Sequence, residues 1–467
     1  MTAKVEKTEP SFEKRLQRIA GIIVLSAVFL PVAIFVVWRM SLSMRLNSKL
    51  AAVAKAGYPV SLADVERMYY PELKPEENGA VFFTNAFTYL TWTNTPKVMD
   101  EFWRIGWRAR RTALSSTVTN ALLRLLLATN EDLLIFLRKA PEFEKSRYPI
   151  KLDQGLEIDL PHLQRIRTCE DIVVLDAEVQ AHAGHTATAI QDLDAALKLS
   201  RSLSNEPILY SQMIRWACHR EIDRGLQLVL SEGGLTDAQL QELSRAVRRE
   251  ENRWSLERAL AGERCAVIDW TQHLFDHAFA DSSNFQGLQI DTNKATALAS
   301  GITKTIGILD ASLDGYLKVS SEEISIVKSP YPQCLVAAKR LDERISKSRS
   351  DFLGSILLSD HRRLVERQAR DMASMELWLT ALAIERYQIA NHDRVPSVLT
   401  DLVPAFLPSV PRDPFDGQPL RFKPLDKGYV IYSVGPDLKD DGGREWQRRP
   451  KGSTNDLPYD ITFIVER

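Results

Sequence analysis

The hydrophobic and polar positions along the chain divide it into one uninterrupted apolar run and a long body with mostly helical periodicity. The run of twenty residues, 19–38, begins at Ile19, ends at Trp38 and holds no charged side chain. A helix of that length rises about 30 Å, which is the thickness of the hydrocarbon layer of a membrane. The pattern therefore predicts one transmembrane helix, with the lipid bilayer as its partner, after a short tail at residues 1–18.

A cleaved signal peptide and a buried core helix are the two alternatives to a transmembrane helix for this run. A cleaved signal peptide has an apolar core of about 7–15 residues and a small-residue exit site, whereas this run is longer and continues into Arg39 and Met40. A buried core helix is rarely apolar on every side over such a length. We therefore expect a retained anchor.

The orientation of the anchor follows from the basic residues on its two sides. Five lysines and arginines precede the run, and four follow it within residues 39–55. The side with more basic residues tends to stay in the cytoplasm. We expect a single-pass protein of the inner (cytoplasmic) membrane, with a cytoplasmic N-terminus and a periplasmic or otherwise extracytoplasmic body.

Residues 39–359 are predicted to form a helical body. The first helix should continue out of the bilayer to Ala56, where Gly57 is a stop signal. Two periodic segments, 172–182 and 186–203, meet at a glycine and predict a helical hairpin that resembles one tetratricopeptide unit. Because no 34-residue repeat follows, the hairpin indicates at most a solenoid-like arrangement. Only residues 148–160 look extended in the first three hundred positions.

The pattern changes after residue 359. A long helix is predicted over residues 360–390, and six prolines between positions 396 and 419 then forbid long helices. Short runs of strand type follow at 420–423, 428–434 and 460–465. The predicted fold class is therefore mainly α, with one transmembrane helix, a multi-helix body and a small C-terminal α+β module at 360–467 that contains a short antiparallel sheet.

The composition limits the classes of partner and the role of the cysteines. The net charge is −1 with 26% charged residues, so no nucleic-acid partner is expected, and 45% hydrophobic residues can build real cores. The cysteines lie too far apart in the sequence for zinc-type pairs. One or two disulfides remain possible, and two disulfides could pair the four cysteines in any of three ways. Most are expected to be buried thiols, with His219 beside one of them interpreted as a surface histidine. The four are Cys169, Cys218, Cys265 and Cys334.

No catalytic motif is recognisable in the sequence, and a weak cluster of polar residues supports the enzyme alternative. Asp269, His273 and His277 recur every four residues, but the HExxH arrangement of zinc enzymes is absent. An ordinary solvated helix face has the same spacing. If the chain is an enzyme, its active site should be a cleft in the helical body around Glu257, Glu263, Asp269 and His273.

The last 77 residues, 391–467, carry several motifs in a characteristic order: VPSVLTDLVPAFLP, VPRDPFDGQPLRF, YVIYSVGPDLKDDGG and NDLPYDI. This stretch resembles the C-terminal region of the major pseudopilin of type II secretion, in which a loop after the corresponding strand binds calcium. The resemblance implies a Ca²⁺ site with Asp437 after the strand, Asp456 and Asp460 as the late acidic pair, and Asp440 and Asp441 as further contributors.

The chemistry of the loop agrees with calcium, because Ca²⁺ takes six to eight oxygen ligands and clustered carboxylates supply them. A solvated acidic turn, neutralised by nearby lysines and arginines, is the alternative. The chain also departs from the pseudopilin pattern: its apolar helix has no prepilin-peptidase site and no glutamate near its start. We therefore do not expect it to polymerise as pseudopilins do.

The sequence favours a membrane-anchored, extracytoplasmic binding or scaffold protein that is associated with an envelope or secretion assembly. Such a protein would act by binding other proteins, whose identity the sequence does not give. The alternative is a membrane-anchored enzyme with an active site in the helical body. A concave pocket that gathers titratable side chains would favour the enzyme.

Overall fold

The computed structural model describes residues 12–91, 107–250, 254–280, 307–347, 361–445 and 459–467. The chain forms two compact units. Unit 1 contains Met1–Tyr58, Thr271–Lys318 and Asp351–Ile356, and unit 2 contains Pro59–Trp270, Val319–Ser350 and Leu357–Arg467. The described chain is mainly helical, and its strands form one small antiparallel sheet.

Helix α1 is the main element of unit 1. It spans Phe12–Lys55 without a break and includes Pro31. It ends as predicted, because Gly57 adopts a positive φ of 84°. Ion pairs of 2.5 Å from Arg39 to Asp310 and of 2.7 Å from Lys49 to Asp314 join it to the first half of helix α14 (Ile308–Val327). The predicted long first helix is thus confirmed.

Unit 2 begins with short helices and continues into long ones. The bounds of its helices are α2 Leu62–Tyr69, α3 Gly79–Ala86, α5 Trp107–Leu114, α6 Thr117–Thr129, α7 Glu131–Arg138, η1 Leu152–Glu157, α8 Pro161–His182, α9 Thr186–Arg201, α10 Leu209–Glu232, α11 Asp237–Arg248, α15 Gln333–Lys347, α17 His361–Ala390 and η2 Leu399–Leu402. Helix α12, Trp254–Ala280, begins in unit 2 and ends in unit 1.

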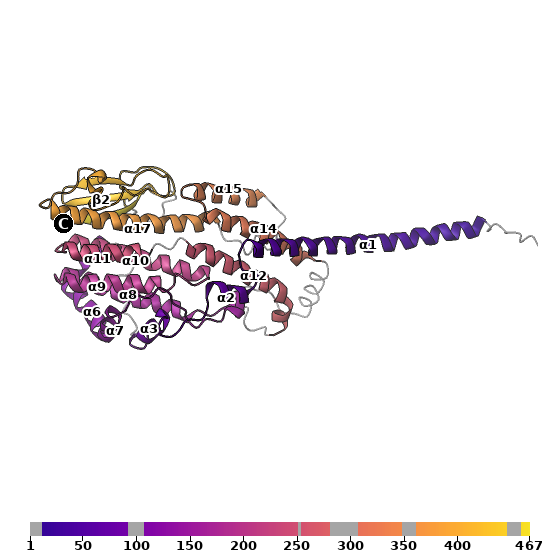
Figure 1. Ribbon diagram of the computed structural model, residues 1–467, viewed down its shortest axis with the longest axis horizontal. Helices are drawn as coiled ribbons and strands as arrows, with labels where there is room; N and C mark the ends of the chain where they lie inside the picture. Colours follow the sequence, from indigo (N-terminus) through magenta and orange to yellow (C-terminus); the bar gives the residue numbers. More distant parts are fainter. Residues whose placement is uncertain (1–11, 92–106, 251–253, 281–306, 348–360, 446–458) are drawn as a thin grey trace, which may run out of the picture. The chain divides into compact units, whose positions relative to one another are not determined.

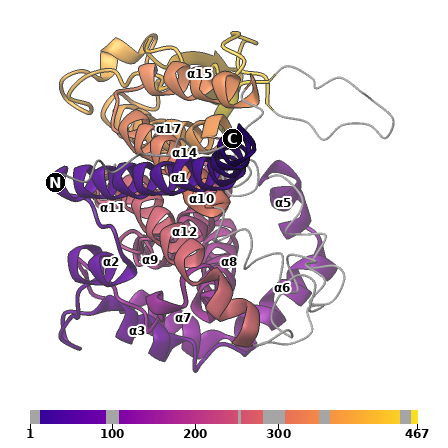
Figure 2. The ribbon, with the colours of Figure 1, turned by 90° about the vertical axis from the view of Figure 1, so that its right-hand side faces the viewer.

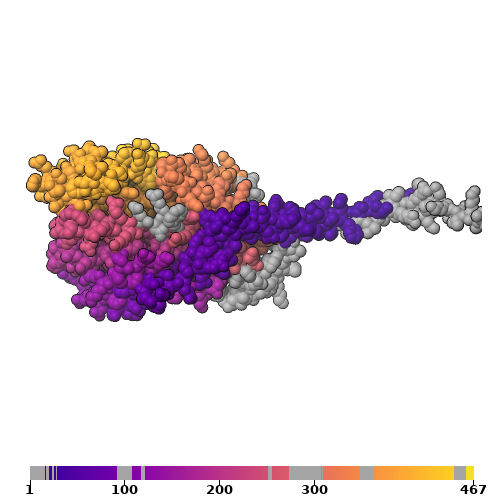
Figure 3. Space-filling model, viewed as in Figure 1, coloured from indigo at the N-terminus to yellow at the C-terminus, as the bar shows by residue number. Residues whose placement is uncertain are grey.

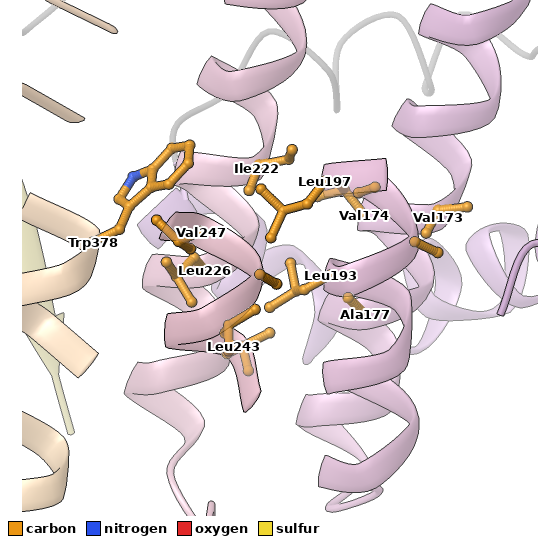
Figure 4. Packing of buried hydrophobic residues seen from close by; sticks show 14 of the residues in the cluster. Val173, Val174, Ala177, Leu193, Leu197, Ile222, Leu226, Leu243, Val247 and Trp378 are labelled. Carbon is orange, nitrogen blue, oxygen red and sulfur yellow. The ribbon is translucent and has the colours of Figure 1, made fainter. Parts of the chain in front are cut away.

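Helices α8 to α11 form the packed bundle of unit 2. The predicted hairpin is confirmed, with Gly184 at a φ of 81° between α8 and α9. Helix α10 packs so closely on α8 that a Cβ on Gly225 would lie 2.5 Å from a methyl carbon of Val174. Figure 4 shows Leu193 and Leu226 interdigitating with their neighbours in this core.

Helix α17 lies between this bundle and the C-terminal sheet, as Figures 1 and 2 show. Towards the bundle it inserts the buried side chain of Trp378, which points at residues of α10 and α11 (Figure 4). Towards the sheet, the hydroxyl of Tyr429 donates 2.9 and 3.3 Å hydrogen bonds to the Glu385 carboxylate and the Ala381 carbonyl. The predicted helix over 360–390 is confirmed, and it is buried on two opposite faces.

The sheet has three antiparallel strands in chain order: β1 Arg421–Leu425, β2 Gly428–Ser433 and β3 Ile461–Glu466. In its register, Ile431 lies opposite both Phe422 and Phe463. The face that contains Ile431 and Phe463 belongs to the same hydrophobic core as helices α8 to α11. The predicted α+β module is confirmed, and it shares its core with the helical bundle.

The outer edge of β3 is closed by helix α10. The side chains of Gln227 and Ser231 accept hydrogen bonds of 3.0 and 3.1 Å from the backbone N–H groups of Ile464 and Glu466. These N–H groups would otherwise be open to pairing with another strand. In the space-filling view, the atoms of the C-terminal module lie directly against those of the preceding helices (Figure 3).

Two expectations about local structure were wrong. The stretch around residues 148–160 is not extended but contains the 3-10 helix η1, which is kinked at Gly155 with a φ of 57°. His219 is not a surface residue, because only 1% of its surface is exposed. All four cysteines are buried and free, as expected for core thiols.

The shared core predicts that the sheet and the helical bundle unfold together. Removing the buried ring in Phe463→Ala should lower the free energy of unfolding by about 3–5 kcal/mol. The unfolding temperature of the helices and that of the sheet should fall equally. Circular dichroism reports on the helices, and hydrogen exchange of the β2 amides reports on the sheet. Lys423→Ala, on the exposed face of β1, is the control and should change neither signal. Loss of the sheet signal alone would contradict the shared core.

Candidate functional site

A cleft with a volume of about 730 Å³ lies where the C-terminal module meets the helices of unit 2. This volume falls in the range of known ligand sites. Its walls come from the start of α12, the loop between α14 and α15, one face of α17 and the turn before β1. The lining residues are Glu257, Val327, Lys328, Ser329, Pro330, Tyr331, Pro332, Gln333, Gln368, Met372, Glu376, Arg412, Asp413, Pro414, Asp416 and Gly417.

The loop between α14 and α15 is fixed to α17 by a tyrosine. The Tyr331 hydroxyl donates a 3.0 Å hydrogen bond to the Gln368 side chain and lies 3.4 Å from the Val365 carbonyl. The prolines on either side of Tyr331 restrict the backbone further. This wall of the cleft is therefore formed in advance of any ligand.

The opposite wall is the DPFDG turn, and its buried carboxylate holds it in place. Asp413 accepts hydrogen bonds of 2.8–2.9 Å from the backbone N–H groups of Phe415 and Val434 and from the Ser433 hydroxyl. Arg421 donates a further bond of 2.8 Å to it. Burial raises the pKa of Asp413, although these hydrogen bonds act in the opposite direction. Asp413 thus joins the turn to the end of β2.

The cleft is lined by charged side chains of both signs and by apolar side chains. Lys328 lies 3.6 Å from Glu257, and Arg412 donates a 2.8 Å hydrogen bond to the Gly417 carbonyl. Pro330 and Met372 contribute apolar surface. A surface of this mixed character can bind a ligand by apolar contact and by charge.

A buried histidine links the bundle to α17 beside this cleft. The Nδ1 atom of His219, on α10, lies 2.7 Å from Asp371 on α17, and its Nε2 atom lies 3.3 Å from Glu250. Burial alone would lower the pKa of His219, but Asp371 and Glu250 outweigh it and raise the pKa to about 8. The imidazole is therefore charged at neutral pH, and it joins α10 to α17 and to the turn that follows α11.

The same histidine contacts a serine in an arrangement that superficially matches a catalytic triad. The hydroxyl of Ser200 lies 3.2 Å from Nε2 of His219, opposite the contact with Asp371. However, Ser200 is completely buried and its hydroxyl donates to the Leu197 carbonyl at 3.0 Å. A charged imidazole also cannot accept the serine proton. We interpret this group as a structural network.

A second buried network was not foreseen from the sequence. Arg110, on the basic helix α5, has no exposed surface; it lies 3.0 Å from Glu178 on α8 and forms an ion pair with Glu221 on α10. Burial raises the pKa of Glu178 to about 7, with Glu221 adding to the effect. Arg110 therefore carries a positive charge into the core, whereas Arg108 of the same helix is exposed.

The loop predicted to bind calcium folds back towards the sheet. The Asp460 carboxylate accepts hydrogen bonds of 3.3 and 2.8 Å from the N–H groups of Asp441 and Gly443. Asp440 accepts a 3.1 Å bond from the Tyr432 hydroxyl. Asp437 is exposed and caps the N–H of Lys439 at 3.2 Å. Within the described residues, no group of three or more metal-binding side chains comes together.

Asp456 lies outside the described residues, so the structure describes four of the five predicted calcium ligands. In the described part of the loop, three of the carboxylates accept hydrogen bonds from backbone N–H groups: Asp437, Asp440 and Asp460. Such bonds stabilise the negative charge without a cation. The calcium site stays a prediction.

The residues of the enzyme alternative do not share one cavity. Glu257 lines the cleft described above, whereas Glu263 lines a second cavity of about 290 Å³. Asp269 lies near Gly155, where a Cβ would be 3.6 Å from its carboxylate. The side chain of His273 lies outside the described part of α12. The predicted cluster is therefore divided between two places.

The chain was compared with known proteins in three ways. It matches no family model, no curated protein and no solved structure.

The His219 network predicts a pH-dependent stability. The folded pKa of about 8 exceeds the unfolded value of about 6.5. The stabilisation is therefore fully present below about pH 6.5 and is lost as the pH rises through about 8, by an amount on the order of 2 kcal/mol.

This can be measured from denaturant unfolding at pH 6 to 9, comparing the full-length chain with His219→Gln. Because Glu178 and other buried carboxyl groups also titrate in this range, the decisive quantity is the difference between the two proteins, which should shrink as the pH rises. His185→Gln, at an exposed histidine, is the control. A difference that does not depend on pH would contradict a charged His219.

Proposed function

We propose that the chain is a single-pass membrane protein of the inner (cytoplasmic) membrane that binds another protein through the cleft at its C-terminal module. In this proposal the N-terminus is cytoplasmic and the body lies outside the cytoplasm, as a component of an envelope or secretion assembly. The C-terminal module is pseudopilin-like, and calcium stabilises its last loop.

The observation that carries the proposal is the surface of α1. The part of α1 at Phe29–Lys55 is long and apolar enough to cross a membrane, and almost none of it is buried; residues 29–38 of it belong to the predicted anchor. Phe29 and Val37 are 65% and 66% exposed. Apolar side chains that remain exposed over such a length have their stable environment in lipid.

The cleft supports the binding role. Its walls are fixed by Tyr331 and Asp413, so little ordering is needed when a partner binds. Its lining presents Lys328 and Arg412 together with acidic and apolar side chains. A segment of a protein that carries both apolar and charged side chains complements this surface better than a strongly charged polymer would.

The pseudopilin likeness is supported by the order of elements. Within the stretch that carries the resemblance, a proline-rich connection and the DPFDG turn lead into three antiparallel strands. The DPFDG and SVGPD segments, which carry part of the resemblance, are joined by the Asp413 hydrogen bonds to Ser433 and Val434. Residues quoted for their likeness thus have a definite structural role.

The anchor predicts that the full-length protein remains in washed membranes after alkaline carbonate extraction. Phe29→Arg with Val32→Arg should release it, because each arginine near the centre of a membrane helix costs about 2.5–3.5 kcal/mol. Leu125→Arg, at an exposed apolar position outside α1, is the matched control and should stay in the pellet. Release of the unmodified protein, or a mature chain beginning near Ser41, would contradict the anchor.

The cleft predicts position-specific contact with a partner. A photoreactive phenylalanine analogue at Met372, inside the cleft, should form one discrete protein adduct in intact cells. The same analogue at exposed Lys423 should not. Pro414→Arg, which places charge in the cleft, should remove the adduct without lowering the unfolding temperature. Equal adducts from both positions would contradict recognition by the cleft.

The calcium proposal predicts an effect of chelator on the unfolding temperature. If Ca²⁺ binds the folded loop, its removal should lower the transition of the full-length protein by a few degrees. Asp437→Asn with Asp440→Asn should remove this difference. The exposed pair Asp426→Asn and Asp393→Asn is the control. An unfolding temperature that does not respond to chelator would exclude a calcium role in stability.

A further inference from the structure

A second cavity of about 290 Å³ lies in unit 2, away from the residues that line the cleft. It is lined by α2, by η1 and the residues after it, by the chain before α10 and by one face of α12. Apart from Tyr210 and Glu263, its lining residues have apolar side chains or are glycines. The lining residues are Leu62, Val65, Leu152, Gly155, Leu156, Ile158, Leu160, Pro207, Ile208, Tyr210, Gly262, Glu263 and Ala266.

The walls of this cavity are set by close backbone contacts. A Cβ on Gly262 would lie only 2.0 Å from the Pro207 carbonyl oxygen, so α12 and the chain before α10 touch through their backbones. On the other side, Gly155 has a φ of 57°, which turns η1 over the cavity. The buried side chains of Val65, Leu152 and Cys265 pack together beside it. The cavity is therefore preformed.

Glu263 is the charged side chain among the lining residues. In the described chain it forms no hydrogen bond or ion pair, and its charged neighbour is Glu323 on α14. The Glu323 carboxylate lies 2.6 Å from the imidazole of His361 and pairs with it instead of with Glu263. Burial raises the pKa of Glu263, and Glu323 raises it further. A carboxyl group facing an apolar space beside a like charge lacks the cation that would stabilise it.

We propose that this cavity binds a small apolar molecule that carries one primary ammonium group. The apolar body would occupy the space between α2 and η1, and the ammonium would donate to the Glu263 carboxylate. Charge and shape select the ligand together: the apolar lining rejects a strongly polar amine, and Glu263 rejects an apolar carboxylate. The cavity shares no lining residue with the cleft, and none of its lining residues lies on α1.

The test uses the full-length protein in lipid nanodiscs and three fluorinated probes of nearly equal size: 4-fluorobenzylamine, 4-fluorobenzyl alcohol and 4-fluorobenzoate. Fluorine NMR titration gives an affinity for each probe. Empty nanodiscs measure partition of the probes into lipid. We expect the amine to bind the protein at least tenfold more tightly than the alcohol, and the benzoate not to bind.

Three variants locate the site. Glu263→Gln keeps the shape of the side chain and should weaken amine binding at least tenfold while leaving the alcohol unchanged. Ala266→Leu fills the cavity and should remove the binding of both. Glu257→Gln, which changes the same residue type on the same helix at the other cavity, should have no effect. Equal affinity for the three probes, or amine binding that survives Glu263→Gln, would overturn the proposal.

Discussion

The burial of helix α17 on two opposite faces is the constraint on which the rest of unit 2 depends. Trp378 fills a space in the bundle and donates a 2.6 Å hydrogen bond to Asp223 on α10. On the other side, Tyr429 and Ile431 of the sheet have no exposed surface. Each large apolar side chain buried in this way contributes about 1.5–3 kcal/mol. Neither the bundle nor the sheet could be removed without exposing one face of α17.

The polar groups buried along this helix follow from the same packing. Burying a charged side chain costs free energy of desolvation unless the charge is paired. Helix α17 supplies such partners both to the bundle and to the end of the chain. Asp371 meets His219 of the bundle, while Glu385 forms an ion pair with Arg467 at the end of the chain. These pairs specify which helices adjoin α17. The cleft lies on the same helix, where Gln368 and Met372 face the DPFDG turn.

Much of the fold could be predicted because its signals are local. The stop at Gly57, the hairpin turn at Gly184 and the strand at 428–434 depend on residues a few positions apart. The environments of Arg110 and His219 could not be predicted, since their partners lie 68 and 152 residues away in Glu178 and Asp371. Nothing in the local pattern distinguishes an arginine that reaches into the core from one in solvent.

The candidate site was missed for a related reason. The cleft combines residues from four segments, and few of them belong to a motif. Only the DPFDG turn carried a signal, and that signal came from its resemblance to pseudopilins. Of the residues predicted for an enzyme, Glu257 and Glu263 line different cavities, because positions six apart on a helix face different directions. A sequence pattern gives helix faces, but the packing decides which faces meet.

Native-state hydrogen exchange tests the central claim most directly, because it reports the stability of each element separately. If α17 joins the sheet and the bundle into one cooperative structure, the slowest amides of β2, α17 and α9 should open with the same free energy, within about 1 kcal/mol, and with the same dependence on denaturant. Amides of β2 that exchange with a free energy several kcal/mol below those of α9 would show that the sheet opens alone, and would contradict the account.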